Sequence, residues 1–97
     1  MYTETNQIEK KFLIDVYTAY QNYRFVSKAN AVTFINIGTI PVTINNTLIL
    51  QPSATGTGAG DSISIGGNIN EKDMTEYFIN FGTATNGAVL IIRKIYV

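Results

Sequence analysis

Apolar residues recur along the chain with a period of two, a pattern that predicts short β-strands separated by tight turns. Residues 40–45 alternate between an aliphatic residue and a proline or polar residue, so we expect a strand with one buried and one solvated face. Pro41 has no N–H for a ladder, and the strand therefore begins there or lies at a sheet edge. Asn45–Asn46 precedes another apolar run, residues 48–50, and predicts a two-residue hairpin turn, because asparagine accepts positive φ.

Further strands are predicted at residues 31–37, 61–65, 77–81 and 88–97. The last of these is almost continuously apolar, which is typical of a central strand covered on both faces. Its charged residues, Arg93 and Lys94, are adjacent and must point to opposite faces of the sheet, an arrangement usual at an exposed strand end.

The beginning of the chain carries two competing patterns. Residues 6–9 have the spacing of a helix capping box, and most apolar residues from 8 to 23 fall on one side of a helix. Apolar residues also alternate over 12–16, in a segment dense in β-forming side chains. We favour strands near 11–17 and 23–27, with the helix as the alternative.

About eight short strands with turn signals between them predict an all-β fold, a small β-sandwich or jelly roll of antiparallel strands. The composition agrees with this fold class: fourteen Ile, twelve Thr and six Tyr suit pleated sheets, and ten Asn and eight Gly supply turns. A chain of 97 residues has room for one modest core. We therefore expect an N-terminal arm over residues 1–10 and a single β-sandwich domain over residues 11–97.

Charge is scarce and balanced. Seven basic residues offset seven acidic ones, so no global field attracts nucleic acid or an anionic membrane. Only 14% of the residues are charged, against about 25% in a typical domain, and Asp61 is the sole charged residue from 29 to 70. Either Ser, Thr and Asn solubilise the surface, or neighbouring subunits cover much of it. Without a signal peptide or a long apolar run, we expect a soluble protein made in a cytoplasm.

The sequence offers little catalytic chemistry. Without Cys or His, the usual zinc ligands and nucleophile–base pairs are missing. The glycines of GTGAG, residues 56–60, lack the lysine and the following helix of a phosphate-binding loop, so we interpret them as a loop before a strand. Glu71, Asp73 and Glu76 fit no calcium loop and predict a solvated turn. We expect no enzyme activity, cofactor, metal or small-molecule substrate.

The segments SKANAVTFINIGTIPVTINNTLILQP, GGNINEKDMTEYFINF and LIIRKIYV together resemble small virion proteins of tailed phages that infect Bacteroidetes-type bacteria. The resemblance spans residues 27–97 and rests on strand and turn patterns, not on a catalytic motif. It implies a capsid-decorating, vertex or head-fibre-base component that binds other copies of itself and a shell protein. It also implies a location in the virion, after synthesis in the host bacterial cytoplasm, and no catalytic residues.

Three function classes remain from the sequence: a structural assembly protein, a carbohydrate or cell-surface binding module, and a small enzyme. The low charge and the lack of an active-site constellation favour the first, as a homo-oligomer that contacts other virion proteins. Tyrosines near the N-terminus are the candidate interface residues, because tyrosine is common at protein interfaces; these are Tyr2, Tyr17, Tyr20 and Tyr23. Ordinary core packing is the alternative role for each of them.

Overall fold

The computed structural model describes residues 11–97; residues 1–10, the predicted N-terminal arm, lie outside the described residues. The described chain forms eight strands and no helix. These strands are β1 (Phe12–Ala19), β2 (Tyr23–Val26), β3 (Ala31–Asn36), β4 (Val42–Ile44), β5 (Leu48–Leu50), β6 (Ser62–Gly66), β7 (Glu76–Asn80) and β8 (Val89–Tyr96). The all-β prediction is confirmed, and the segment after residue 11 is a strand, not the alternative helix.

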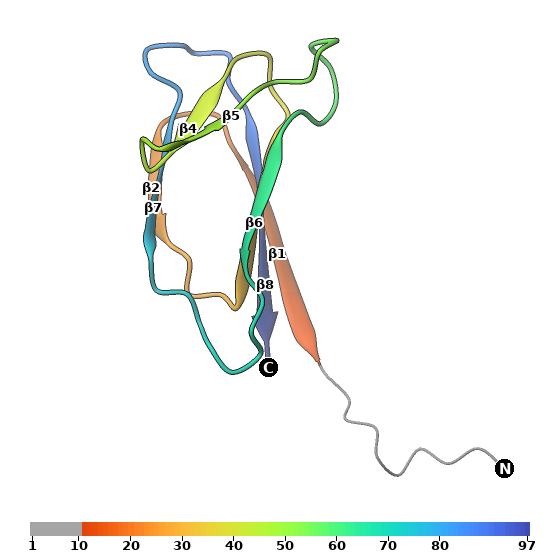
Figure 1. Ribbon diagram of the computed structural model, residues 1–97, viewed down its shortest axis with the longest axis vertical. Coiled ribbons are helices and arrows are strands. Elements are labelled where there is room, and N and C mark those ends of the chain that lie inside the picture. The colour runs from red at the N-terminus through yellow and green to blue at the C-terminus, as the bar shows by residue number, and fades with distance from the viewer. Residues whose placement is uncertain (1–10) are drawn as a thin grey trace, which may run out of the picture.

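The strands form two antiparallel four-stranded sheets that face each other (Figure 1). Sheet A has the order β1-β8-β3-β6, and sheet B has the order β2-β7-β4-β5. The first strand pairs with the last, the second with the seventh, the third with the sixth and the fourth with the fifth. A long antiparallel ribbon rolled into two sheets gives this pairing, so the sandwich has jelly-roll topology.

The core lies between the sheets and follows the alternation of each strand. Phe34 on β3, Ile44 on β4, Ile79 on β7 and Ile91 on β8 all point inward and are fully buried. Burying a side chain of this size contributes about 1.5–3 kcal/mol relative to leaving it exposed. The alternation of apolar and polar residues in the sequence therefore arises because each sheet buries one face against the other.

Asn45 and Asn46 form the centre of the turn between β4 and β5, as predicted, and the Thr47 N–H donates to the Ile44 carbonyl at 3.2 Å. The loop between the paired residues Ile44 and Leu48 has three residues, however, one more than predicted. Asn45 and Asn46 adopt φ values of 53° and 58°, the positive values that this turn requires. The Asn45 side-chain oxygen also accepts a hydrogen bond of 2.7 Å from the Phe78 N–H. Strand β4 begins directly after Pro41, the first of the two positions allowed for that proline.

The glycine-rich loop leads into β6, as predicted. The Ser53 hydroxyl donates to the Thr57 carbonyl at 2.6 Å and accepts from the Thr57 N–H at 3.1 Å, which closes the loop on itself. At the end of the loop, a Cβ at Gly60 would lie 2.4 Å from the Gln51 carbonyl oxygen, so only glycine fits there. Glycine at these positions thus serves chain reversal and close backbone packing.

Strand β8 is central in sheet A, as predicted, but it is not covered on both faces. Its inward residues Val89 and Ile91 are fully buried, whereas the outward Leu90 and Ile92 are half-buried. Within residues 11–97, sheet B packs on the inner face of sheet A, and no second layer covers the outer face. The expectation of two covered faces was therefore wrong for the single chain.

The adjacent basic residues of β8 point to opposite faces, but neither marks an exposed strand end. Arg93 points inward, where its Nε donates to the Ser27 carbonyl at 2.8 Å and its guanidinium pairs with Asp15 at 2.7 Å. Lys94 points outward, with its Nζ 4.4 Å from the centroid of the Phe12 ring. Each basic residue therefore has a specific partner on β1.

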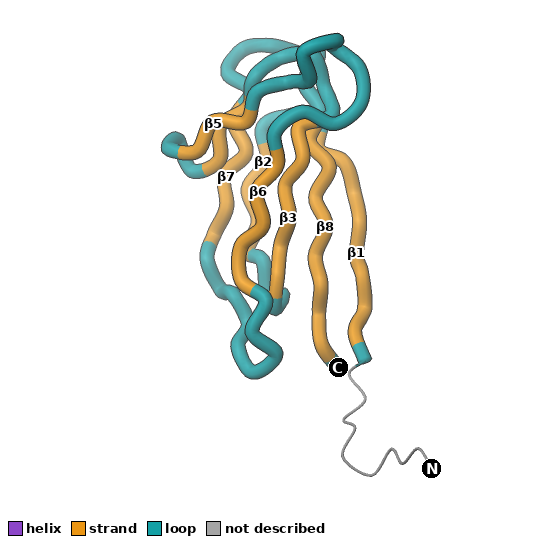
Figure 2. Tube along the Cα trace, turned by 45° about the vertical axis from the view of Figure 1, so that its right-hand side comes forward, coloured by secondary structure: helices purple, strands orange, loops and turns teal. Residues whose placement is uncertain are grey.

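The connections between the sheets place several loops together. The turns after β1, β3, β5 and β7 lie at one end of the sandwich (Figure 2). At the opposite end, the Val97 N–H donates to the Lys11 carbonyl at 3.0 Å, so the last residue lies beside the residue that precedes β1.

Candidate interaction surface

Strand β1 exposes an unusual amount of apolar surface. It is eight residues long and, within residues 11–97, forms a free edge of sheet A, where β6, β3, β8 and β1 lie in a row (Figure 2). The exposed fractions are 45% for Phe12, 58% for Leu13, 58% for Ile14 and 50% for Val16. Three consecutive apolar residues and a fourth close by are thus in contact with solvent.

The exposed side chains of β1 lie on both faces of the strand. The register with β8 places Phe12, Ile14 and Val16 on the outer face of sheet A, and Leu13 on the face that looks toward sheet B. The next strand, β8, buries its outward side chains more deeply than β1 does. The exposure is therefore concentrated along the free edge of sheet A.

The outer face of sheet A is almost free of charge. Cross-strand rows on this face combine Val16, Ile92 and Thr33, and next to them Thr18, Leu90 and Ile35, listed in the order β1, β8, β3. Its one charged residue in the described strands is Lys94, whose Nζ lies 4.4 Å from the Phe12 ring and 5.3 Å from the Tyr96 ring. Both distances are within the range of a cation–π contact. This face therefore presents mainly aliphatic and aromatic surface with little charge.

On the inner face of β1, Asp15 is part of an ion pair. Its carboxylate accepts a hydrogen bond of 2.7 Å from Arg93, and the side chain of Asp15 is 50% exposed while that of Arg93 is 20% exposed. Arg93 is held from its other side by the Ser27 carbonyl. The negative charge at the middle of β1 is thus balanced by a fixed positive charge on β8.

The structure separates the predicted interface tyrosines. Tyr2 lies outside the described residues. Tyr17 and Tyr23 belong to an aromatic cluster between the sheets: their ring centroids are 5.7 Å apart, and Phe25 stacks on Tyr23 at 5.6 Å. Burial, and then the nearby Tyr23 hydroxyl, raise the pKa of Tyr17 above its usual range. These two tyrosines help to pack the sheets together, and their role as interface anchors stays a prediction.

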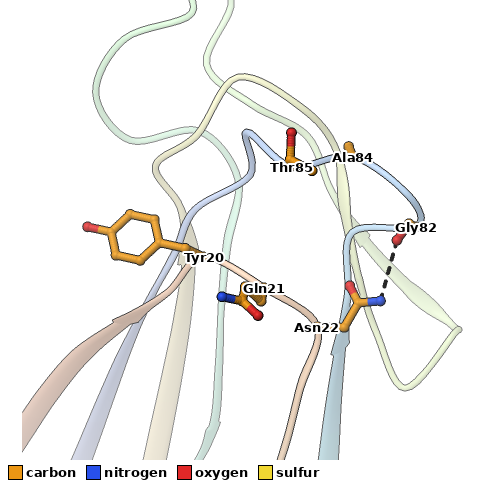
Figure 3. A pocket seen from close by; sticks show the side chains of 6 residues that line it. All are labelled: Tyr20, Gln21, Asn22, Gly82, Ala84 and Thr85. Atoms are coloured by element: carbon orange, nitrogen blue, oxygen red, sulfur yellow. Dashed lines mark hydrogen bonds between the residues drawn. The ribbon is translucent and has the colours of Figure 1, made fainter.

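Among the predicted tyrosines within residues 11–97, Tyr20 is the most exposed, at 62%. It follows β1 and borders an open hollow of about 480 Å³ between the β1–β2 turn and residues 82–85. Figure 3 shows its ring pointing away from Ala84 and Thr85 on the opposite side of the hollow. The ring does not form a wall against which a sugar could stack in this hollow.

The polar side chain at the base of the hollow already has partners. The Asn22 oxygen accepts from the Phe81 N–H at 2.8 Å, and its amide donates to the Gly82 carbonyl at 3.4 Å (Figure 3). These bonds join the β1–β2 turn to the β7–β8 connection. The hollow is therefore a gap between two tethered loops, and its geometry gives no support to the sugar-binding alternative.

The acidic segment forms a hydrogen-bonded turn. The Asp73 carboxylate accepts from the Thr75 N–H at 2.9 Å and from the Tyr77 hydroxyl. Burial alone would raise the pKa of Asp73, but these hydrogen bonds outweigh it, and the pKa lies below its usual value. Over residues 11–97, no three His, Cys, Asp or Glu side chains lie where they could hold a metal ion together.

The exposed apolar surface of β1 contains residues that were not among the candidates predicted from the sequence. Phe12, Ile14 and Val16 were assigned to one alternating face of a strand, and such a face is usually buried. The signal that distinguishes them is the unbroken Phe12-Leu13-Ile14 run, which puts apolar side chains on both faces of one strand. Such a strand is either central or, at an edge, in need of a partner.

Comparison with known proteins gave no relative: no family model, no curated protein and no solved structure matches this chain. In residues 11–97, the structure contains no helix with the length and apolar character needed to cross a bilayer.

Proposed function

We propose that this chain is a non-enzymatic structural protein of a phage particle, such as a capsid-decorating or vertex component, that acts by binding other protein subunits, including copies of itself. The observation that supports this function best is the exposed apolar run of β1. Large exposed apolar patches are rare on monomers and usually belong to binding surfaces.

The energetics of this surface favour a protein partner. Covering Ile14, which is 58% exposed, removes apolar area from water and contributes up to about 1.5–3 kcal/mol. Little charge has to be desolvated, because Lys94 is the only charged residue that the described strands place on the outer face, and it already contacts two rings. A nucleic acid or an anionic membrane would instead select a basic surface, and the net charge here is zero.

The fold is compatible with this proposal but does not select it. Jelly rolls occur in viral capsid proteins and equally in lectins and cupins, so topology alone gives no function. The apolar surface of β1 and the resemblance of residues 27–97 to small virion proteins support the proposed role. The particle in which the protein would be found is tested separately, by detecting it in purified virions of the phage that encodes it.

Self-association is tested by the solution mass of the full chain at concentrations from about 1 μM to high micromolar. We expect a closed oligomer, most simply a dimer or trimer, and a melting temperature that rises with protein concentration, because subunit contacts stabilise the folded state. A monomer mass at every concentration, with a constant melting temperature, would contradict self-association.

A matched pair of variants assigns the contact to β1. Ile14→Lys places a charge in the exposed run, and we expect it to weaken association at least tenfold. Ile49→Lys is the control, because Ile49 is also 58% exposed but lies on β5 in the other sheet. Equal effects of the two substitutions would show that β1 is not the binding surface.

A further inference from the structure

We propose that the partner of β1 is β1 of a second copy of this chain, paired antiparallel about Asp15, so that two four-stranded sheets join into one of eight strands. This inference rests on the proposed function and specifies its geometry. The exposure of β1, the direction of its free backbone groups and its charges support this pairing.

The exposure pattern calls for a neighbouring strand and not only for a covering layer. A layer on the outer face of sheet A would bury Phe12, Ile14 and Val16, but it would leave Leu13 exposed on the other face. A strand beside β1 covers side chains on both faces at once, because residues directly opposite in an antiparallel pair lie close together. The exposure of Leu13 therefore favours pairing along the edge.

The ladder with β8 determines which backbone groups of β1 are free. The Val97 N–H bonds to the Lys11 carbonyl, and bonded pairs alternate with non-bonded pairs along an antiparallel ladder. With the observed register, the odd-numbered residues of β1 bond to β8. The even-numbered residues, Phe12, Ile14, Val16 and Thr18, then direct their N–H and C=O groups to the open edge.

The positions of these free backbone groups restrict the register in which two copies of β1 can pair symmetrically. Even-numbered residues have to lie opposite even-numbered residues, and the register centred on Asp15 uses all four of them. Phe12 then lies opposite Thr18 of the second copy, and Ile14 lies opposite Val16 of the second copy. Aliphatic and aromatic cross-strand pairs of this kind stabilise antiparallel sheets by about 0.2–1 kcal/mol each.

The charges at the centre of this register balance. Asp15 lies opposite Asp15 of the second copy, and like charges in that position are unfavourable on their own. Each carboxylate, however, is already paired at 2.7 Å with Arg93 of its own chain. The junction therefore contains two acids and two guanidinium groups with no net charge.

A second copy suits this edge because the edge is self-complementary. The free donors and acceptors are symmetric about Asp15, so a two-fold axis through that point satisfies both strands and closes the assembly. Strand β1 has eight residues, whereas the other edge strands β2, β5 and β6 have four, three and five. Pairing β1 with its own copy removes the longest open edge of the sandwich, the kind of edge that invites aggregation.

Single cysteines test the register, because the chain has no cysteine of its own. In the proposed pair, the Cα atoms of the two copies of residue 15 are about 4.5 Å apart, within the range for a disulfide. We expect Asp15→Cys to give a covalent dimer under mild oxidation, and Leu13→Cys, two residues from the axis, to give none. Because Asp15→Cys also removes the ion pair with Arg93, a mixture of Ile14→Cys and Val16→Cys chains provides a second test and should form the 14–16 disulfide.

A proline tests the backbone bonds directly. The Val16 N–H faces the open edge, so Val16→Pro removes a donor to the second copy without breaking the ladder to β8, and edge strands tolerate proline. We expect it to weaken association at least tenfold in sedimentation, while the circular dichroism spectrum stays that of a β protein. Val16→Thr keeps the N–H and the branched shape, and it should associate within about threefold of the wild type.

The outcomes separate this inference from the proposed function. If the wild type associates and Ile14→Lys prevents it, but residue 15 does not crosslink and Val16→Pro associates normally, the edge pairing is overturned and the subunit-binding function stands. A covalent dimer through Leu13→Cys would overturn the proposed register. A wild-type chain that is monomeric at every concentration would overturn both the pairing and the self-association from which it follows.

Discussion

Buried asparagines position the loops of this sandwich one side chain at a time. The fully buried Asn36 donates from its amide to the carbonyls of Ile40 and Leu50, each at 2.9 Å, and accepts from the Gly38 N–H at 2.9 Å. Asn30 donates to three carbonyls of the β6–β7 connection and accepts from the Tyr96 N–H at 2.9 Å. Single polar side chains thus satisfy backbone groups that no strand pairs.

Replacing Asn36 is therefore expected to be costly. Asn36→Ala leaves two carbonyls and one N–H without these bonds at a largely buried site, and we expect the free energy of unfolding to fall by about 2–4 kcal/mol. Asn86→Ala is the control, because Asn86 is exposed and makes one side-chain bond of 3.3 Å to Thr39. Urea denaturation of both variants measures the difference, and equal midpoints would contradict the role given to Asn36.

Asp73 predicts how stability responds to acid. Its pKa in the folded protein lies below the ordinary value of 3.8, because hydrogen bonds from Thr75 and Tyr77 outweigh the effect of burial. A lowered pKa contributes stability that is present above pH 4 and is lost as the pH falls through the folded-state pKa. We expect Asp73→Asn to reduce stability at pH 7 and to flatten the loss below pH 4. Urea midpoints from pH 2 to pH 7 would show two parallel curves if Asp73 had no such role.

At the scale of the elements, local turn chemistry decides where strands stop. Asn45 has φ of 53° and accepts a hydrogen bond from the Phe78 N–H on β7, so one residue both turns the hairpin and joins it to the neighbouring strand of sheet B. Gly38 provides a second example: a Cβ there would lie 2.6 Å from the Ala88 backbone nitrogen. Both turns depend on the identity of one residue.

Two substitutions in the β4–β5 turn are expected to affect stability differently. Asn45→Ala strains a residue at positive φ and removes its hydrogen bond, and we expect a loss of about 1–3 kcal/mol. Asn46→Gly relieves positive φ without removing a strong bond, and it should leave stability unchanged or raise it by a few tenths of a kcal/mol. Thermal denaturation of the two variants distinguishes them; a larger loss for Asn46→Gly would show that the turn depends on its Asn80 contact instead.

Most strands were predictable from the sequence because alternation is a local property, as in residues 40–45 and 77–81. Strand neighbours were not predictable, since the pairing of Phe12 with Tyr96 joins residues at opposite ends of the chain. The exposure of Leu13 and Ile14 depends on that pairing. The outward side chains of β8 were wrongly expected to lie under a second layer. A continuous apolar run such as LIIRKIYV occurs both in strands covered by a second layer and in strands whose outer face is shielded only by the neighbouring strands of the same sheet.

At the scale of the whole molecule, each sheet contains a pair of strands that are far apart in the sequence: β1 with β8 in sheet A, and β2 with β7 in sheet B. Sheet A contains β1 and β8 together with β3 and β6. The aromatic cluster of Tyr17, Tyr23 and Phe25 packs between β1 of sheet A and β2 of sheet B. The same arrangement exposes the apolar run of β1 at a free edge. The jelly-roll topology therefore explains both the arrangement of the sheets and the position of the candidate surface at an edge.

The pairing of β1 with β8 also governs how this chain can be made. During synthesis β1 is made before β8, and it has no strand to pair with in sheet A until β8 has left the ribosome. Sheet A cannot be completed until β1 pairs with β8, and contacts of such large sequence separation slow folding. We therefore expect refolding to take about milliseconds to seconds, which is slow for a chain of this size. Stopped-flow dilution from urea measures this rate, and completion within microseconds would contradict it. Until β8 has been made, the nascent Phe12-Leu13-Ile14 segment is unpaired on both edges, and unpaired apolar edges of this kind are prone to aggregate.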